Sequence, residues 1–490
     1  MSLSQALMIA SQSLGTISSQ IGVVSRNISN AGVEGATKKT SLVVTGVNGG
    51  AEFAGIRRET NEALFRKLLS ANAASGASER ISDALDQIDL ELNLSDTTQN
   101  RSLATLISKF SNALQNYSVN PDNQITADQA LRAAKDIVSG LRSSTLSIQE
   151  IRQQADTNIA SAVAEINDIL EKISDINHDV VVGSGTGVDV IDSIDRRDGL
   201  LMQLSKKIGL STIVRPNNDL VIYASNGATL LETTPRTVSF IKSNNLSAGI
   251  VGSAVYIDGV QSSGTGAPAP LLSGEIAGDI KFRDSIAPIY QNQLDEIARG
   301  LITAFAEKDQ TGVAAPLPGL FTTAGATNLP VASITPGIAG ALIINPNVDP
   351  DQGGDVKRLR DGGISGNAAY IYNTQGVTGF TDRLLELSDA ASVNQIFDPA
   401  AQLDTSTSLN GFAAASVGWI GALRQNIARE TTYQGAIVSQ STQALSNATG
   451  VNLDDQMAHM LTLENAYQIS AKLLQTINTI YDDLFAAVSR

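Results

Sequence analysis

The sequence predicts a mainly α-helical fold with a β insertion. Both chain ends are expected to form a long, antiparallel, coiled-coil-like helical bundle. Three observations support this class. Apolar residues recur every three or four positions over residues 3–31 and again over 453–487, which is the spacing of a helical seam. Similar spacing extends through much of residues 61–180, whereas residues 211–282 alternate with a period of two, as β-strands do.

The first predicted helix covers residues 3–31 and carries almost no charge. Its apolar positions advance by four and three residues in strict alternation, and no charged residue precedes Arg26. A core helix of a monomer normally shows a charged outer face, so this composition favours burial by neighbouring subunits over an ordinary buried helix. Its candidate interface residues are Leu3, Leu7, Leu14, Ile17, Ile21, Val24, Ile28 and Asn30.

The last predicted helix carries a similar, less regular stripe. Because both stripes have the same spacing and aliphatic character, we expect residues 17–28 to meet residues 473–484 in the assembled state. A chain with seam-forming helices at both ends is typical of an assembly protein. The candidate interface residues here are Leu453, Met457, Leu461, Tyr467, Ile469, Leu473, Ile477, Ile480 and Leu484.

Between the ends, the pattern predicts nested domains. Residues 41–45 resemble a short strand before a turn at Gly49 and Gly50, and residues 183–187 resemble a flexible glycine-rich connector. We expect a terminal coiled-coil-like assembly domain (1–35 and 450–490), a helical rod domain (36–205, 284–308 and 381–449), an inserted β domain (206–283) and a loop-rich insertion with short strands (309–380).

Nesting places the two chain ends together at one pole of the molecule and the β insertion at the other. Both ends of that insertion should lie on the same helical body. We therefore expect that excising residues 211–282 leaves the helical part folded.

Composition excludes several classes of function. The net charge of −15 argues against nucleic acid and against anionic membrane surfaces as partners. The absence of cysteine excludes disulfides and thiolate chemistry. Residues 1–25 lack the basic segment of a secretory signal peptide, and prolines interrupt the uncharged run at 322–348, so no membrane span is expected.

No constellation of residues predicts catalysis, a cofactor or a metal centre. His178 and His459 lie far from any matching ligand set. Asp349 and Asp351 resemble the start of a calcium loop, but Arg360 stands where its glutamate belongs, so a turn is favoured and a weak surface cation site stays open. The charged run 192–198 is interpreted as a solvated face.

Several motifs resemble those of flagellar axial proteins. They are residues 25–31 (SRNISNA), 449–457 (TGVNLDDQM) and 464–472 (ENAYQISAK). Residues 195–204 (DRRDGLLMQL) and 274–295 narrow the resemblance, since they are similar to segments of the flagellar hook-associated protein 1 family. The resemblance spans nearly the whole chain.

This resemblance implies an extracellular structural protein of the bacterial flagellum rather than an enzyme. It implies export by the flagellar type III apparatus without a cleaved signal peptide, and an export chaperone bound at the C-terminal helix. It further implies self-assembly into a ring or helical turn on the hook protein, with the second junction protein following below the filament. The family joins hook to filament and provides a base for filament assembly.

Two alternative classes stay open at this stage. A hook- or rod-type axial protein, or another flagellin-like filament component, would share the terminal motifs. The helical tract at 61–180 argues against the hook and rod types, which are mostly β between their ends. A surface adhesin with coiled-coil ends is the remaining alternative, and staining over the whole cell surface would favour it.

Overall fold

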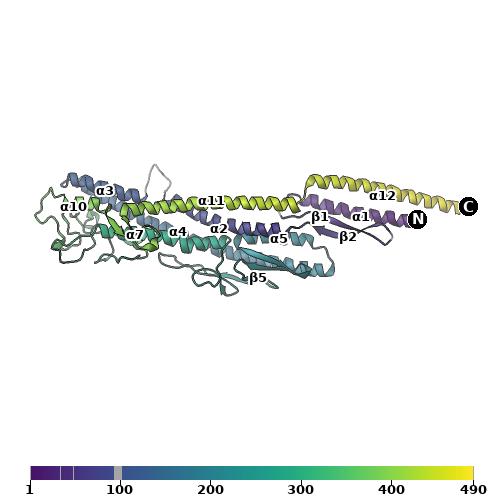
Figure 1. Ribbon diagram of the computed structural model, residues 1–490, viewed down its shortest axis with the longest axis horizontal. Helices are drawn as coiled ribbons and strands as arrows, with labels where there is room; N and C mark the ends of the chain where they lie inside the picture. Colours follow the sequence, from purple (N-terminus) through teal and green to yellow (C-terminus); the bar gives the residue numbers. More distant parts are fainter. Residues whose placement is uncertain (1, 34, 48, 93–101, 489–490) are drawn as a thin grey trace.

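Long helices set the shape of the molecule. The computed structural model describes residues 2–33, 35–47, 49–92 and 102–488. The helices run along one direction and form an elongated rod, with both chain ends at one tip (Figure 1). The mainly helical class with a β insertion is therefore confirmed.

Helix α4 (Gln124–Thr186) is the longest element, with 63 residues. At 1.5 Å per residue it extends for about 95 Å. The Asn123 side chain caps its start by accepting a hydrogen bond from Ile125 N (2.9 Å), and Gly187 ends it with a left-handed φ of 79°.

The glycine-rich connector predicted at residues 183–187 is wrong, because residues 183–186 continue helix α4. The glycine at 183 serves close packing instead of flexibility. A Cβ atom added to Gly183 would lie 2.3 Å from Val190 Cγ1, at the start of the next helix. Only glycine permits this approach.

The other elements are shorter. The helices of four or more residues are α1 (Leu3–Asn30), α2 (Glu62–Leu92), α3 (Leu103–Val119), α5 (Ile191–Lys207), α6 (Glu275–Lys281), the π-helical turn η2 (Phe282–Ile286), α7 (Ala287–Ala304), α8 (Ile338–Ala341), α9 (Arg358–Asp361), α10 (Asp382–Ala390), α11 (Leu409–Thr449) and α12 (Leu453–Val488). The strands are β1 (Lys39–Thr45), β2 (Ala51–Arg58), β3 (Leu210–Val214), β4 (Leu220–Ala224), β5 (Thr229–Leu231), β6 (Val238–Phe240), β7 (Val255–Ile257), β8 (Val260–Gln261), β9 (Phe321–Thr323), β10 (Leu342–Ile344), β11 (Asn394–Ile396) and β12 (Ser406–Ser408).

The first half of α4 contributes to the larger hydrophobic core, together with parts of α2, α3, α7, α10 and α11. Phe110, Phe305 and Phe321 pack at its centre with ring centroids 5.2–5.7 Å apart. The rest of this core is mostly aliphatic, with five further buried aromatic residues: Tyr117, Phe282, Tyr290, Phe397 and Phe412.

The inserted strands form two small antiparallel sheets, with strand orders β3-β4-β5 and β6-β7-β8. They lie along the flank of the rod beside α4 and α5 (Figure 1). The pole opposite the chain ends is instead formed by α3, α10 and the nearby loops. The predicted placement of the β insertion at that pole is wrong, because its apolar faces pack on the side of α4.

The second half of α4 shares its core with this insertion. Ile159, Ile166 and Leu170 of α4 are fully buried in one cluster with β4 residues Leu220 and Ile222. The two ends of the insertion are adjacent, since Gly209 N donates to Ser273 O (3.1 Å). A short linker could therefore replace the insertion. Its removal would nevertheless expose an apolar face of α4 to water.

Residues 309–380 contain mostly loops with short strands. Strand β9 pairs antiparallel with β10. Asp295 of α7 fixes this segment by accepting hydrogen bonds from Gly337 N and Ala339 N, both at 2.9 Å. Burial raises the pKa of Asp295 to about 6, although those backbone donors oppose the shift.

The shared core reverses the expected result of excision. Deleting residues 211–272 should lower the melting temperature by more than about 10 °C or cause aggregation, because several fully buried residues of α4 become exposed. Circular dichroism melting tests this. A variant that also carries polar substitutions at Ile166, Leu170 and Ile173 should regain solubility. A deletion variant that melts like the parent would contradict the shared core.

Candidate assembly interface

Helices α1 and α12 pack side by side in opposite directions at the tip of the rod (Figure 1). Their contact buries a small apolar core made by Ile17, Val24 and Leu463. Four partly buried residues pack around this core: Ile21, Ile28, Met460 and Ala466. The 3/4 spacing of α1 thus places its second half on the first half of α12.

The pairing within one chain differs from the register that we expected for the assembled state. Asn27 Nδ2 donates to Gln456 Oε1 (2.9 Å), so the end of α1 faces the beginning of α12. In the predicted partner stripe Ile477 is buried, whereas Leu473, Ile480 and Leu484 are exposed by 44–55%. Residues 17–28 therefore meet residues 460–466 within the chain.

The predicted interface residues fall into two groups by exposure. In α1, Ile17 and Val24 are buried, and the others, Leu3, Leu7, Leu14, Ile21, Ile28 and Asn30, are partly buried. In α12, Ile477 is buried. The remaining eight, exposed by 44–67%, are Leu453, Met457, Leu461, Tyr467, Ile469, Leu473, Ile480 and Leu484.

Helix α12 carries apolar side chains on more faces than α1 can cover. The hairpin of β1 and β2 packs against a further face of α1, where Thr16 Oγ1 donates to Ala51 O (2.8 Å). Large exposed apolar patches mark interaction surfaces. The outer face of α12 is therefore our candidate assembly interface.

A buried ammonium group connects this helix pair to the rod. The side chain of Lys39, in β1, is 1% exposed. Its Nζ lies 2.9 Å from Asp195 Oδ2 and 2.9 Å from Asp192 Oδ1, both on α5. Asp195 also accepts from Arg58 Nη1 (3.0 Å) and from Thr37 Oγ1 (2.7 Å). We call Asn27, Lys39, Arg58, Asp195 and Gln456 the joint.

Asn27 completes the joint from the side of α1. Its Oδ1 accepts from Lys39 N (2.9 Å), and its Nδ2 donates to Lys39 O (2.8 Å) as well as to Gln456. One buried amide therefore holds β1 and α12 at once. Buried polar groups are tolerated only when they are satisfied in this way, so the geometry at this point is specific.

The break between α11 and α12 lies at the same place. Lys38 N donates to Thr449 O (2.7 Å), the last residue of α11. Asn452 caps α12 by accepting from Asp454 N (3.0 Å). The chain thus changes direction beside the joint, and the sequence motif at residues 449–457 supplies both the break and Gln456.

The charged run at residues 192–198 is only partly a solvated face: Asp192 and Arg196 are exposed, but that interpretation is wrong for Asp195, Arg197 and Asp198. Arg197 is buried, and its Nη1 donates to Asn177 Oδ1 (2.6 Å) and Asn218 O (2.7 Å). Burial lowers the pKa of Arg197. Burial also raises the pKa of Asp198, which the Arg58 guanidinium partly opposes.

Sequence reasoning found the motifs of the joint but missed its central residues. Within residues 25–31 it selected Asn30, whereas Asn27 makes the buried contacts. The sequence did not identify Lys39 and Arg58 as residues of the joint, because their partner Asp195 lies more than 130 positions away. A lysine at the start of an apolar strand was the one local signal for Lys39.

The sequence also drew attention to two histidines and to a turn that resembles a calcium loop. His178 and His459 are exposed, and no cluster of three potential metal ligands occurs among the described residues. At the turn that resembles a calcium loop, the Lys135 ammonium lies 2.8 Å from Asp349 Oδ1 and 2.7 Å from Asp351 Oδ2. A cation of the protein itself therefore neutralises that turn.

Helices within the described ranges are either too short or too polar to cross a lipid bilayer.

Comparison with known families gives two matches. Residues 85–319 match the family described as flagellar hook-associated protein FlgK helical domain. Residues 442–486 match the family described as flagellar basal body rod FlgEFG protein C-terminal, which covers most of α12.

Relatives match along nearly the whole chain at low identity. The flagellar hook-associated protein 1 of Escherichia coli strain K12 is 20% identical over 97% of this chain and 98% of that protein. The protein of the same name from Bacillus subtilis strain 168 is 19% identical over 98% and 96%. The solved hook junction protein FlgK of Burkholderia pseudomallei matches with a TM-score of 0.57 and 14% identity, over 77% of this chain and 99% of that one, which supports the fold.

Replacing one carboxylate of the joint should loosen the tip. Asp195→Asn leaves the buried Lys39 ammonium short of a counter-charge, at a cost of about 3 kcal/mol. The half-exposed Asp192 makes a matched control, because Asp192→Asn should cost less than about 1 kcal/mol. Trypsin cleavage after Lys38 and Lys39 should accelerate at least tenfold in Asp195→Asn alone. Equal cleavage rates in both variants would show that burial of the pair does not hold the joint.

Proposed function

The chain belongs to the flagellar hook-associated protein family, and we propose that it joins the hook to the filament and serves as a base for filament assembly. The observation that carries this proposal is the apolar outer face of α12 at the tip of the rod. In this structural role the protein acts through packing contacts with its neighbours and not through catalysis. We assign it no catalytic residue and no cofactor.

The apolar face supports self-assembly into a ring or helical turn. Nine large apolar side chains of α12 in the described part of the chain are exposed by 44–68% although α1 packs beside the helix. In an assembly the terminal helices of neighbouring copies would cover these side chains, with hook protein on one side and the second junction protein on the other. The seam-like spacing fits helix-to-helix packing of this kind.

The joint supports a mechanical role. It fixes the α1–α12 pair to the rod through buried ion pairs and amide hydrogen bonds, which have defined directions. A subunit that links a bendable hook to a stiffer filament must transmit force from its tip to its body. A specific polar connection does this better than a flexible linker.

The same apolar helix explains why we propose a chaperone. Before assembly, α12 would expose its apolar face to water and promote aggregation. We propose that a flagellar export chaperone covers the C-terminal helix. The protein then leaves the cell through the flagellar type III apparatus, without a cleaved signal peptide, and becomes part of the extracellular flagellum.

A hook- or rod-type axial protein is the second candidate, since residues 442–486 match a rod protein family. The helical body favours the junction role over this one, because α2, α3 and α4 lie within or next to the match to the hook-associated helical domain. A surface adhesin has no specific observation in its favour. Neither nucleic acid nor membrane is proposed as a partner.

Location distinguishes these roles. In a strain whose filament protein is removed, labelled antibody against this chain should bind the distal tips of the bare hooks, seen by electron microscopy. Label along the hook or rod would favour the second candidate. Uniform label over the cell surface would favour an adhesin and contradict the proposed role.

A charge on the outer face of α12 should stop assembly without unfolding the chain. Ile469 is 67% exposed, so Ile469→Asp should change the melting temperature of the monomer by less than about 2 °C. In an assembly the buried carboxylate costs several kcal/mol. The variant should therefore be absent from hook tips, and filament protein should be lost to the medium.

The matched control places the same charge on the exposed polar face of α11, at Gln440→Asp. That variant should assemble like the parent. Normal filaments from Ile469→Asp would show that the outer face of α12 does not carry assembly.

A further inference from the structure

The tip of the molecule is attached to the rod at few points. We call α1, β1, β2 and α12 the tip unit. Its apolar core consists of α1 and α12 side chains, and no described residue of the tip unit belongs to either core of the rod. Among the described elements, α1 packs extensively against α12, β1 and β2 and against no rod helix. Apolar packing therefore does not fix the angle between the tip unit and the rod.

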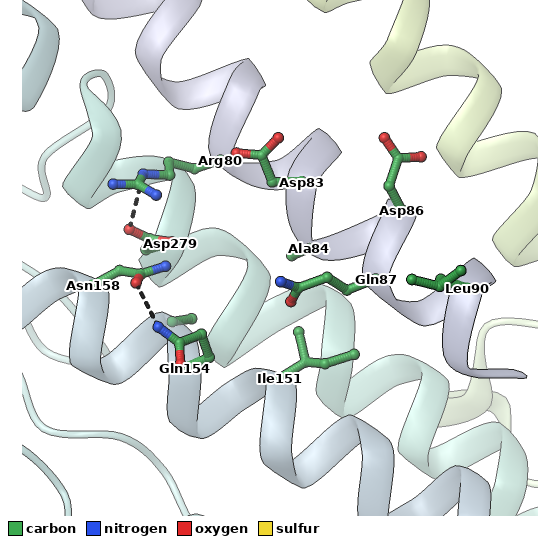
Figure 2. Close-up of a pocket in the computed structure, with 11 residues that line it drawn as sticks. Arg80, Asp83, Ala84, Asp86, Gln87, Leu90, Ile151, Gln154, Asn158 and Asp279 are labelled. Carbon is green, nitrogen blue, oxygen red and sulfur yellow. Dashed lines mark hydrogen bonds and ion pairs between the residues drawn. The ribbon is translucent and has the colours of Figure 1, made fainter.

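The rod, in contrast, is one packed body. Helix α4 passes through both of its apolar cores. Side chains of three helices also meet on its flank, where Arg80 Nε of α2 lies 3.7 Å from Asp279 Oδ2 of α6 and Asn158 of α4 lies beside them (Figure 2). A change of angle between tip unit and rod is therefore concentrated in the segments that connect the two.

Two short segments make this connection, and they converge on one residue. They are residues 59–61, between β2 and α2, and residues 450–452, between α11 and α12. Glu59 N donates to Lys38 O (2.8 Å), and Lys38 N donates to Thr449 O (2.7 Å). Lys38 directly precedes the buried Lys39 of the joint. Short connections at the ends of elements are where hinges form, so the joint lies at the pivot of a hinge.

One ion pair spans this hinge away from the pivot. Arg26 Nη1 of α1 lies 2.8 Å from Asp189 Oδ2, at the start of α5. It also lies 3.7 Å from Asp192, a carboxylate that Lys39 of the joint shares. Among the described residues, Arg26 is the one side chain of α1 or α12 with an ion pair to the rod. Asp189 precedes Asp195 of the joint by six residues, so Arg26 holds the rod at a second point.

This second point is far more exposed than the joint. The side chains of Arg26 and Asp189 are 37% and 39% exposed, whereas those of Lys39 and Asp195 are 1% and 10% exposed. Salt screens ion pairs in water strongly and buried pairs much less. Rising ionic strength therefore weakens the contact of Arg26 first and leaves the joint in place.

We propose that Arg26 and Asp189 form a salt-sensitive catch that sets the angle of the tip unit. When the catch is closed, the tip unit is held at two points and its angle is fixed. When the catch opens, the tip unit swings about Lys38, while the joint keeps it attached to the rod. In the proposed junction role such a swing would let the tip follow a bending hook, although the swing itself is a property of the single chain.

Förster transfer within the free monomer measures this angle. The chain has no cysteine, so Glu171→Cys on α4 and Gln468→Cys on α12 give two exposed dye sites on opposite sides of the hinge. Between about 0.05 M and about 0.5 M salt the Debye length falls roughly threefold, and the distribution of dye distances should shift and widen about twofold.

Removing the catch should have the same effect without salt. Arg26→Gln in the labelled chain should show the wide distribution already at low salt and no further change when salt is added. Asp189→Asn is a second variant with the same expected result, since its side-chain oxygen can still accept the hydrogen bond from Ile191 N.

A matched ion pair away from the hinge provides the control. Arg215 lies 2.6 Å from Glu232 within the β insertion, and both side chains are 41% exposed. Arg215→Gln should therefore respond to salt like the labelled parent. If Arg215→Gln opened the hinge as Arg26→Gln does, a general loss of ionic stabilisation would explain the swing, and the catch would be overturned.

Two further outcomes would overturn the catch. One is a labelled parent whose dye distances do not respond to salt, and the other is a distribution that stays narrow in Arg26→Gln. A circular dichroism melt within about 2 °C of the parent shows that a variant is folded. If Arg26→Gln fails that check, Asp189→Asn decides between an open and a closed hinge.

Discussion

The ammonium group of Lys39 is the constraint on which the rest of the tip depends. A buried charge is stable only if opposite charge and hydrogen-bond acceptors surround it. Asp192 and Asp195 of α5 supply these from the rod, and Asn27 of α1 holds the backbone of Lys39 from the tip. Strand β1 therefore cannot shift along α5 without leaving a charge unpaired in the interior.

Three segments far apart in the chain meet at this joint. They belong to the motifs at residues 25–31, 195–204 and 449–457. Asn27 and Gln456 bond each other directly, whereas Asp195 is connected to them through Lys39 of β1, so no segment can hold the geometry alone. This gives a physical account of motifs that are rich in asparagine, aspartate and arginine yet carry no catalytic pattern.

The rod supports the tip by a different principle. Helix α4 passes through two apolar cores, one with the neighbouring helices and one with the β insertion. Directional polar contacts thus fix the orientation of the tip, whereas aliphatic packing gives the body its stiffness. The outer face of α12 lies beyond both, where apolar side chains stay available to neighbours.

Periodicity predicted what depends on local spacing. The 3/4 stripes located α1, α4 and α12, and the period of two located the inserted strands, because helices and strands repeat with fixed geometry. Spacing could not show that Asn27 rather than Asn30 lies in the joint, or that Arg197 is buried. Those outcomes depend on partners from distant segments. Gly183 was misread because a glycine at a close contact and a glycine in a loop look alike in sequence.

The prediction that the β insertion lies at the opposite pole was wrong for a related reason. Because the insertion is nested in the sequence, its two ends are expected to lie close together in space, and Gly209 and Ser273 are indeed hydrogen-bonded. It does not fix the direction in which the insertion leaves the rod. Apolar residues on α4, such as Ile166 and Leu170, decide that direction by pairing with the sheets along the flank.

The most direct test of the joint is a double-mutant cycle between Lys39 and Asp195, made with Lys39→Met and Asp195→Leu. The quantity measured is the opening free energy of the backbone around residues 36–45, from hydrogen exchange of that peptide under native conditions. A buried ion pair that fixes the tip predicts a coupling energy of about 1–3 kcal/mol between the two substitutions. Effects that add within about 0.4 kcal/mol would mean that the two residues act independently, and would contradict the account.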